Sequence, residues 1–595
     1  MEDRKNLDKR YTWDLTRFYK NEEQIEHDIE KMKLLNTKIV SLRGKLNTSD
    51  AIFSYFQICE EMSVVCERLG AYVMLRIALD GKDKKALSLS SRLSILETKM
   101  AQETAFVSYE LAQNTDEFLS SLIKENRFKD FDLDIKDIIR SKPHTLSEEK
   151  EKLLAGIGEF ANPEDLYDGL TDVDLKFEDV VLLDGSKTEL TGANYSFLIS
   201  NEEQSVRKQT FENMHNVYMS HNMSLSTNFI SKLKKGAFFS KQHNFKSVKQ
   251  SKFFGDEMPE LVLDRLVGAV NSNLKFYQDY LKLRKDNLKL DKYYVYDNYV
   301  PVIKQVEIKP TYEEAVDIFK KAVSCLGDKY VEYVDNQVAN RYVDVFETKN
   351  KNSGAFNADL NICNPYVLLN YKPSFYWLGT LAHEFGHMVN TCLINDSQPL
   401  SKRGCSIFTA EIASTVNECL LYEYLLETTK DKNFKLFLLD KFLSEFNATV
   451  FRQTMFTEFE LFAHGAIEQE KPIIYEDLNE FYGSLQSKYF GKDVELPECA
   501  KFEWSRIPHF YRPFYVYSYA TGFISATIIA NRIKKEGKPF VDKYIKFLSS
   551  GESDSGYNIL KKLGIDICDS KTFEEGFAVY KSKIEQMKKM LEELC

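Results

Sequence analysis

Residues 381–390 read LAHEFGHMVN and place two histidines one helical turn apart, with a glutamate beside the first. Side chains at i and i+4 of an α-helix leave the same face, so the imidazoles of His383 and His387 can converge on one ion. Glu384 lies about 100° round the helix from His383, where its carboxylate can reach a water on that ion. This spacing predicts a metal site, and zinc is the ion it favours.

Two ordinary histidines are the alternative interpretation. The chain has only nine histidines in 595 residues. A HExxH pattern is therefore expected by chance on the order of 0.01 times in a chain of this kind. The metal interpretation is favoured, but it needs a third protein ligand, because catalytic zinc usually has three and keeps one position for water.

The HEFGH stretch has the pattern of a helix. Ser374 follows Pro373 and can cap a helix that runs to about Leu393. The apolar residues at helical spacing are Leu378, Leu381, Ala382, Phe385, Met388, Val389 and Cys392. They predict that one face of this helix is buried and that the histidines leave another.

A second helix, predicted over 408–427 (FTAEIASTVNECLLYEYLLE), supplies candidates for the third ligand. Glu411 and Glu418 are two turns apart and face the same way. One carboxylate can bind the metal while the other accepts a hydrogen bond from a ligating histidine. The alternative is a pair of solvated surface glutamates. The apolar and small residues around them, downstream of HEFGH, favour the ligand interpretation.

Composition and charge indicate a large globular protein. Hydrophobic residues make up 43 %, aromatic residues 13 % and charged residues 28 %, and the formal net charge is −11. The acidic balance argues against general affinity for nucleic acid or anionic membranes. The uncharged run 514–531 is long enough to span a bilayer. Its tyrosines, other hydroxyl residues, glycine and asparagine favour a buried helix instead.

The N-terminal sequence and the cysteines lead us to expect a cytoplasmic protein. The N-terminus, MEDRKNLDKR, is charged and lacks the apolar region of a signal peptide. The ten cysteines are scattered with no CxxC pair, as expected for reduced thiols rather than for a cysteine metal site.

Hydrophobic periodicity predicts a mainly α protein with a small β component. A hairpin is expected over 177–192, around Asp184-Gly185, and extended segments over 293–302 and 341–360. A small β-sheet beside the HExxH helix is also expected. Three regions are expected: an N-terminal helical region (1–115), an intermediate helical region with the hairpin (116–200) and a catalytic domain (201–595).

Three further motifs accompany HEFGH and the stretch AEIASTVNE that contains Glu411. They are YTWDLTRFY (11–19), SGAF (353–356) and IPHFYRPFYVYSYATG (507–522). With HEFGH, they span nearly the whole chain. In this order, the set resembles the thimet oligopeptidase and oligoendopeptidase F family of zinc metallopeptidases, most closely its oligoendopeptidase F branch.

The resemblance implies one Zn²⁺ per chain, bound by His383, His387 and Glu411, with Glu384 as general base and Glu418 behind a ligand. It also implies a mostly helical fold whose deep enclosed cleft admits short peptides as substrates. Gly354 and Ala355 would lie on a sheet edge that pairs with the peptide backbone, although a plain turn is the alternative for SGAF.

The family also has a histidine and one or more tyrosines that stabilise the oxyanion. His509 and Tyr519 are the preferred candidates here, with Tyr515 next, since Tyr515 and Tyr519 share a face if this segment is helical. Tyr511 and Tyr517 are nearby, and the spacing alone does not separate these tyrosines. For His464, a packed or hydrogen-bonded role is expected.

The function expected from these residues is zinc-dependent hydrolysis of internal bonds in short peptides. Three alternatives remain at this point: a non-catalytic zinc-containing peptide-binding protein, a helical scaffold with a fortuitous motif, and a zinc hydrolase that removes terminal residues. The intact Glu384 argues against the first, because binding alone needs no base. The sequence leaves the oligomeric state and the cleavage preference open.

Overall fold

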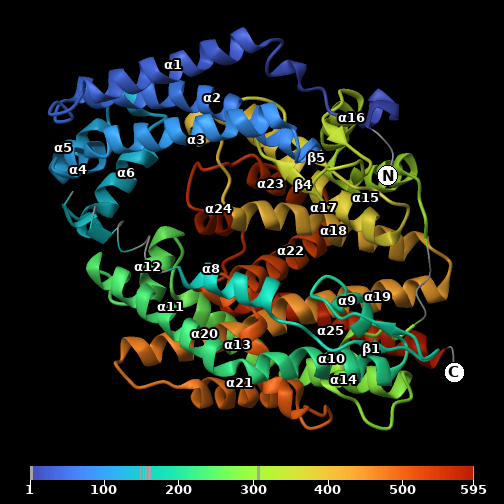
Figure 1. Cartoon of the computed structure of the whole chain (residues 1–595). Coiled ribbons are helices and arrows are strands. Elements are labelled where there is room, and N and C mark those ends of the chain that lie inside the picture. Colours follow the sequence, from blue (N-terminus) through green and yellow to red (C-terminus); the bar gives the residue numbers. More distant parts are fainter. Residues whose placement is uncertain are drawn as a thin grey trace. The chain divides into compact units, whose positions relative to one another are not determined.

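The computed structural model describes residues 4–147, 149–151, 153–154, 157, 162–303 and 308–593. The chain divides into two compact units, each built from three segments. Unit 1 comprises Met1–Lys152, Glu307–Tyr424 and Ile529–Gly564, and unit 2 comprises Leu153–Val306, Leu425–Ile528 and Ile565–Cys595. Helices dominate both units, so the mainly α fold class is confirmed (Figure 1). The predicted boundaries near residues 115 and 200 stay a prediction.

Unit 1 contains a bundle of N-terminal helices and the helices that carry HEFGH and Glu411. Its helices are α1 (Glu22–Val40), α2 (Ser49–Leu79), α3 (Lys84–Thr104), α4 (Phe106–Ala112), α5 (Asp116–Leu122), α6 (Asp132–Ser141), α15 (Tyr312–Val323), α16 (Asp328–Ala339), α17 (Phe375–Ser397), α18 (Ile407–Thr428, ending in unit 2), α23 (Lys538–Leu548) and α24 (Gly556–Lys562). The apolar stripe of α1, with Ile25, Ile29 and Met32 buried, packs against α2 and α3.

Unit 2 is also helical and contains the predicted hairpin. Its helices are α8 (Pro163–Asp168), α9 (Tyr195–Ile199), α10 (Gln204–Ser220), α11 (Asn222–Gln242), α12 (Val248–Gly255), α13 (Leu261–Ser272), α14 (Leu274–Asn287), α19 (Lys432–Phe446), α20 (Arg452–Glu468), α21 (Tyr475–Phe490), α22 (Tyr517–Glu536, ending in unit 1) and α25 (Ser570–Glu592). The hairpin pairs β1 (Val180–Val181) with β2 (Lys187–Thr188) in antiparallel register, and Gly185 takes the positive φ that its turn requires.

The sheet of unit 1 has three short strands: β3 (Val343–Asp344), β4 (Phe356–Ala358) and β5 (Tyr366–Leu368). The central β5 pairs in parallel with β3 and antiparallel with β4, which leaves β4 at an edge. Both β4 and β5 contact α17, so the predicted sheet beside the HExxH helix is confirmed. Residues 343–344 and 356–358 lie within the predicted extended segment, whereas β5 was not expected.

The motif YTWDL fixes this sheet from the N-terminus. The indole nitrogen of buried Trp13 donates to the carbonyls of Tyr342 and Val367, at 3.0 and 2.9 Å. The Trp13 amide donates to the carboxylate of Asp344, which also pairs with Lys351. A single residue near the start of the chain therefore joins two strands that lie far along the sequence.

The prediction of an extended segment over residues 293–302 is wrong. Residues 295–299 form a 3-10 helix (Val295–Tyr299), and only Tyr294 forms an isolated bridge with Glu495. Asp297 stabilises this helical turn. Its carboxylate accepts a hydrogen bond from the Tyr294 amide and forms an ion pair with Arg207, and the side chains of Asp297 and Arg207 are both buried. A buried ion pair has overridden the β propensity of the tyrosines and valines.

The uncharged run 514–531 is a buried helix only from Tyr517, where α22 begins. Ala520, Ile524, Ile528 and Ile529 on this helix are buried. No helix within the described ranges is long and apolar enough to cross a membrane.

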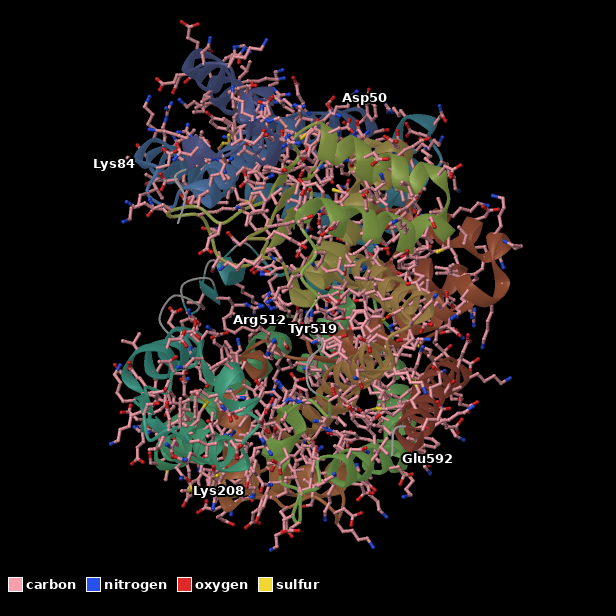
Figure 2. The ribbon with its side chains drawn as sticks, turned by 90° about the vertical axis from the view of Figure 1, so that its right-hand side faces the viewer. Asp50, Lys84, Lys208, Arg512, Tyr519 and Glu592 are labelled. Atoms are coloured by element: carbon pink, nitrogen blue, oxygen red, sulfur yellow. The ribbon has the colours of Figure 1, made fainter. Side chains whose placement is uncertain are left out.

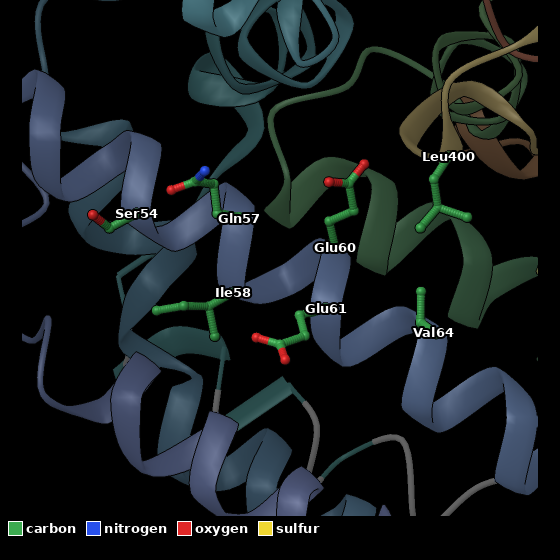
Figure 3. Close-up of a pocket in the computed structure, with 7 residues that line it drawn as sticks. All are labelled: Ser54, Gln57, Ile58, Glu60, Glu61, Val64 and Leu400. Carbon is green, nitrogen blue, oxygen red and sulfur yellow. The ribbon is translucent and has the colours of Figure 1, made fainter.

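One pocket of about 640 Å³ lies along α2 in unit 1 (Figure 3). Its lining residues are Ser54, Gln57, Ile58, Glu60, Glu61, Val64 and Leu400. The pocket shares no residue with the motifs described above.

Candidate active site

Helix α17 positions the HEFGH residues as the sequence predicted. Ser374 caps it by accepting a hydrogen bond from the Trp377 amide at 3.3 Å. Leu381 and Phe385 are fully buried on the core face, while His383 and His387 are partly exposed. The apolar stripe thus sets the direction in which the two imidazoles point.

Gly386, the glycine of HEFGH, allows α18 to approach α17 closely. A Cβ atom at this position would lie 2.6 Å from Cα of Ser414 and 3.1 Å from the carbonyl oxygen of Ala413. Both contacts are with backbone, which cannot swing away as a side chain can. Because Gly386 has no side chain, α18 can lie close enough to α17 for Glu411 and Glu418 to approach the histidines.

We expect Gly386→Ala to destabilise the protein by about 1–3 kcal/mol, because the added methyl group overpacks the contact between α17 and α18. Gly379→Ala on the same helix is the matched control. Its Cβ would lie 3.8 Å from the Tyr422 hydroxyl, an ordinary contact, so stability should be unchanged or higher. Chemical denaturation of both variants measures the difference, and equal stabilities would contradict the close approach.

Two imidazole nitrogens and one carboxylate oxygen converge between α17 and α18. Nε2 of His383 lies 3.2 Å from Nε2 of His387 and 3.6 Å from Oε2 of Glu411. The ligand atoms of these three residues all lie within 4.8 Å of one another. Ligands about 2.0–2.1 Å from a tetrahedral zinc ion are about 3.3 Å apart. The donor types and their spacing therefore fit a zinc ion.

Glu418 lies behind His383. Its Oε1 is 2.7 Å from Nδ1 of that histidine, so the carboxylate accepts a hydrogen bond from Nδ1–H. This contact fixes the imidazole with Nε2 directed towards His387 and Glu411. A carboxylate behind a metal-binding histidine orients the ring and increases its basicity.

The two histidines have opposite electrostatic environments. Burial alone would lower the pKa of His383, but the hydrogen bond to Glu418 and the nearby carboxylates outweigh it and raise the pKa to about 9. Burial lowers the pKa of His387 to about 3, and the charge of His383 lowers it further. A protonated His383 can therefore donate from Nε2 to neutral His387. A metal ion would occupy the position of that proton, since ligands bind deprotonated.

Glu384 is buried, with 8 % of its surface exposed. Burial raises its pKa to about 7, against the opposing charge of His383, and the charges of Glu411 and Asp359 raise it further. A carboxyl group with a pKa near neutrality can both accept and release a proton.

The SGAF motif lies directly before the edge strand β4. Gly354 has a φ of +79°, in the region that favours glycine, and its carbonyl accepts a hydrogen bond from the Asn370 side chain. Ala355 immediately precedes Phe356, the first residue of β4. The chain bends at Ser353 and Gly354 and then enters β4, which lies at an edge of the sheet. Pairing of this segment with a peptide stays a prediction.

Sequence reasoning missed the connection between this strand and α17. Oδ1 of Asp359 accepts hydrogen bonds from Thr391 on α17 and from Asn357 on β4, both at 2.5 Å. Thr391 also donates to the carbonyl of His387. The only sequence signal was the polar pair in FNADL, which a loop would equally explain.

His509, Tyr515 and Tyr519 form one aromatic cluster in unit 2. The rings of His509 and Tyr515 are stacked at 6.2 Å, and Tyr519 meets each of them edge-on at 5.9 and 5.3 Å. All three side chains are partly exposed. Tyr515 precedes α22, so the two tyrosines are brought together by a turn and not by helical spacing.

The other two tyrosines of this segment point into the interior. The Tyr511 hydroxyl bonds with Asn228 and its ring packs on Tyr167, while Tyr517 stacks on Phe253. Tyr515 and Tyr519 thus lie beside His509, whereas Tyr511 and Tyr517 make interior contacts; the role of each tyrosine stays a prediction. His464 is fully packed, and burial lowers its pKa to about 3.

Comparisons with known families match most of the chain. The pattern of Peptidase family M3 matches residues 197–579, and that of Oligopeptidase F matches residues 110–177. The first match alone covers more than half of the sequence and includes both α17 and α18.

Individual relatives align over nearly their full lengths. Oligopeptidase PepF of Bacillus subtilis is 34 % identical, over 99 % of this chain and 88 % of its own. An oligoendopeptidase F homolog of Borreliella burgdorferi is also 34 % identical, over 100 % of both chains. The crystal structure of oligoendopeptidase-F from Enterococcus faecium is 28 % identical, with a TM-score of 0.74, over 96 % of this chain and 99 % of that one.

Proposed function

Because this chain belongs to peptidase family M3, we propose that it hydrolyses internal bonds of short peptides with zinc held by His383, His387 and Glu411. The chain is a metalloendopeptidase of the oligoendopeptidase F type. One observation carries the proposal: two imidazole nitrogens and a carboxylate oxygen converge beside a buried glutamate with a pKa of about 7.

One zinc ion per chain would complete this set of ligands. When bound, it would polarise the peptide carbonyl and acidify a water molecule. Glu418 holds His383 so that its Nε2 faces His387 and Glu411, and the neutral ring of His387 could also bind the ion. Zinc fits the nitrogen and oxygen donors better than magnesium or calcium, which favour oxygen ligands.

Glu384 is the general base in this proposal. Its carboxylate takes a proton from the attacking water and then delivers it to the leaving amine. Burial favours the protonated form after the first transfer, because a charged carboxylate is poorly solvated there. The cation would stabilise the carboxylate beforehand, so the same group suits both steps.

His509 and Tyr519 are proposed to donate hydrogen bonds to the carbonyl oxygen as it gains negative charge, with Tyr515 supporting them. Burial and the charge of Arg512 lower the pKa of His509, so its neutral ring donates through one N–H group. The stacking of this histidine on Tyr515 favours one ring orientation.

The edge strand β4 is the proposed site of backbone recognition. Its outer edge can pair with an extended peptide, and Gly354 and Ala355 allow close approach because their side chains are small or absent. Short peptides suit this mode, and the Bacillus subtilis relative is named an oligopeptidase. A cytoplasmic location stays a prediction from the sequence.

We expect Tyr519→Phe and His509→Gln each to lower kcat by about 10²–10³-fold with zinc content unchanged, because each removes one oxyanion donor. Tyr511→Phe is the matched control. Its hydroxyl faces Asn228 in the interior, so kcat should stay the same while stability falls by about 1 kcal/mol. Initial rates on a quenched peptide test the set. If Tyr511→Phe and Tyr519→Phe lowered kcat equally, the assignment of Tyr519 as an oxyanion donor would be wrong.

The test of the function uses a pool of peptides of about eight residues, blocked at both ends, with products identified by mass spectrometry. Internal cleavage is expected. Release of terminal residues, seen only from unblocked peptides, would instead support the hydrolase that trims ends. Zinc binding without any cleavage across the pool would support the peptide-binding alternative.

A further inference from the structure

The backbone before Tyr515 has an uncommon conformation. Phe514 has a φ of +48°, which is rare for a bulky residue, and only 1 % of its surface is exposed. It occupies the turn between the short helix Pro508–Tyr511 and α22. Figure 2 labels Arg512 and Tyr519, which precede and follow Phe514 in the sequence. Such a conformation persists only where surrounding groups enforce it.

Helix α20 supplies the groups that hold Phe514. Oε1 of Glu460 accepts a hydrogen bond from the Phe514 amide at 2.7 Å. One turn further along the same helix, the ring of His464 packs against the Phe514 ring at 4.9 Å. Backbone and side chain of this one residue are therefore both fixed from α20.

Glu460 is an unusual choice for a purely structural position. It is 1 % exposed, and its second oxygen, Oε2, has no hydrogen-bond partner among the described residues. Burial raises its pKa to about 8, so the carboxyl group is mostly neutral at pH 7. Burying a carboxyl group that makes one hydrogen bond is costly, but an aliphatic side chain at this position would leave the buried Phe514 amide without its acceptor. Its contribution is therefore to geometry.

We propose that Glu460 is a positioning residue that holds Phe514 in its left-handed conformation and thereby directs Tyr515, His509 and Tyr519. The inference rests on the proposed function, because it assigns these three residues to the oxyanion. Without an acceptor at position 460, the Phe514 backbone can relax to negative φ. This change turns the following Tyr515, whose ring packs against the other two.

The test compares Glu460→Leu with Glu460→Gln. The leucine variant removes the acceptor, and we expect kcat to fall about 10–100-fold with KM nearly unchanged, since a misplacement of about 1 Å has such effects. The glutamine variant keeps a neutral carbonyl acceptor of the same size and should restore kcat to within about threefold. Zinc content should equal that of wild type in both.

Glu468→Leu is the matched control. Glu468 lies on the same helix, and its Oε1 also accepts a backbone N–H at 2.7 Å, from Val248 on α12. Its loss releases a different segment, so kcat should not change. Hydrogen exchange gives a second readout: the amides of residues 512 and 514–519 should exchange faster in Glu460→Leu, but not in Glu460→Gln or Glu468→Leu.

The possible outcomes separate this inference from the proposed function. If Tyr519→Phe and His509→Gln lose activity while folded Glu460→Leu does not, Glu460 has no positioning role and the donors stand. If neither donor variant loses activity, the donor assignment fails.

If Glu460→Leu does not fold, the glutamine variant provides the test. A folded Glu460→Gln with kcat more than tenfold lower would overturn the inference. Full activity with normal exchange of residues 512 and 514–519 would support it.

Discussion

Glu384→Gln is expected to lower kcat by about 10³-fold while the protein keeps one zinc ion per chain. Glutamine has the size of glutamate, so α17 and its two histidines stay in place. It cannot accept a proton from water, however, and the step that Glu384 performs is lost. The side chain does not belong to the three converging ligands, so the metal should remain bound.

Metal analysis and initial rates on the same preparations check this expectation. Glu332→Gln, a change at an exposed position of α16, controls for handling and should behave as wild type. Zinc retained with cleavage lost supports the base role. Cleavage retained at more than a tenth of the wild-type rate would mean that another group takes the proton.

The pH dependence gives an independent check of the same residue. A base must be deprotonated, so kcat/KM of the wild type should rise as pH increases through the pKa of Glu384. Burial raises that pKa to about 7, and a bound cation would lower it, so the midpoint should lie below 7. The residual activity of Glu384→Gln should lack this acidic limb. An unchanged profile would assign the titration to a different group.

The second large effect is expected from His387→Ala, which should remove zinc and activity together. Two donor atoms then remain, and the alanine side chain supplies no ligand in place of the imidazole. Glu418→Gln should have a graded effect: zinc affinity about 10–100-fold weaker, because the hydrogen bond behind His383 changes while all three ligands stay.

Competition with a chromogenic chelator measures the zinc affinity of the wild type, of His387→Ala and of Glu418→Gln. Added zinc then distinguishes the two variants. Excess zinc should restore cleavage by Glu418→Gln but not by His387→Ala. Chelation should also lower the melting temperature of the wild type, since a ligand of the folded state stabilises it. Wild-type zinc affinity in His387→Ala would place the metal elsewhere.

The sequence predicted those features that depend on local periodicity. The i and i+4 spacing of His383 and His387, and the two-turn spacing of Glu411 and Glu418, describe helices that the structure contains. The helix cap at Ser374 and the hairpin turn at Gly185 followed from turn and cap chemistry. Periodicity could place side chains on a face, but it could not show that Gly386 sets the distance between two helices.

Features decided by distant partners were beyond sequence reasoning. The segment around Asp297 forms a helical turn because Asp297 pairs with Arg207, and no pattern within residues 293–302 predicts that ion pair. The choice among the tyrosines depends on where α22 begins, and Phe514 ends the apparent helical run with a positive φ. The acceptor that stabilises this conformation, Glu460, lies on another helix.

The contact of Trp13 with the sheet also constrains the order of events during synthesis. Its indole donates to the carbonyl of Val367, 354 residues later in the chain. At a translation rate of about 5–20 residues per second, that partner leaves the ribosome on the order of 20–70 s after Trp13. Until then this tryptophan is without its final environment, and unit 1 is complete only when Gly564 has been made. The apolar residues of the early segments that pack against residues 342–368, Trp13 and Phe18 among them, therefore lack those partners until that part of the chain has been made.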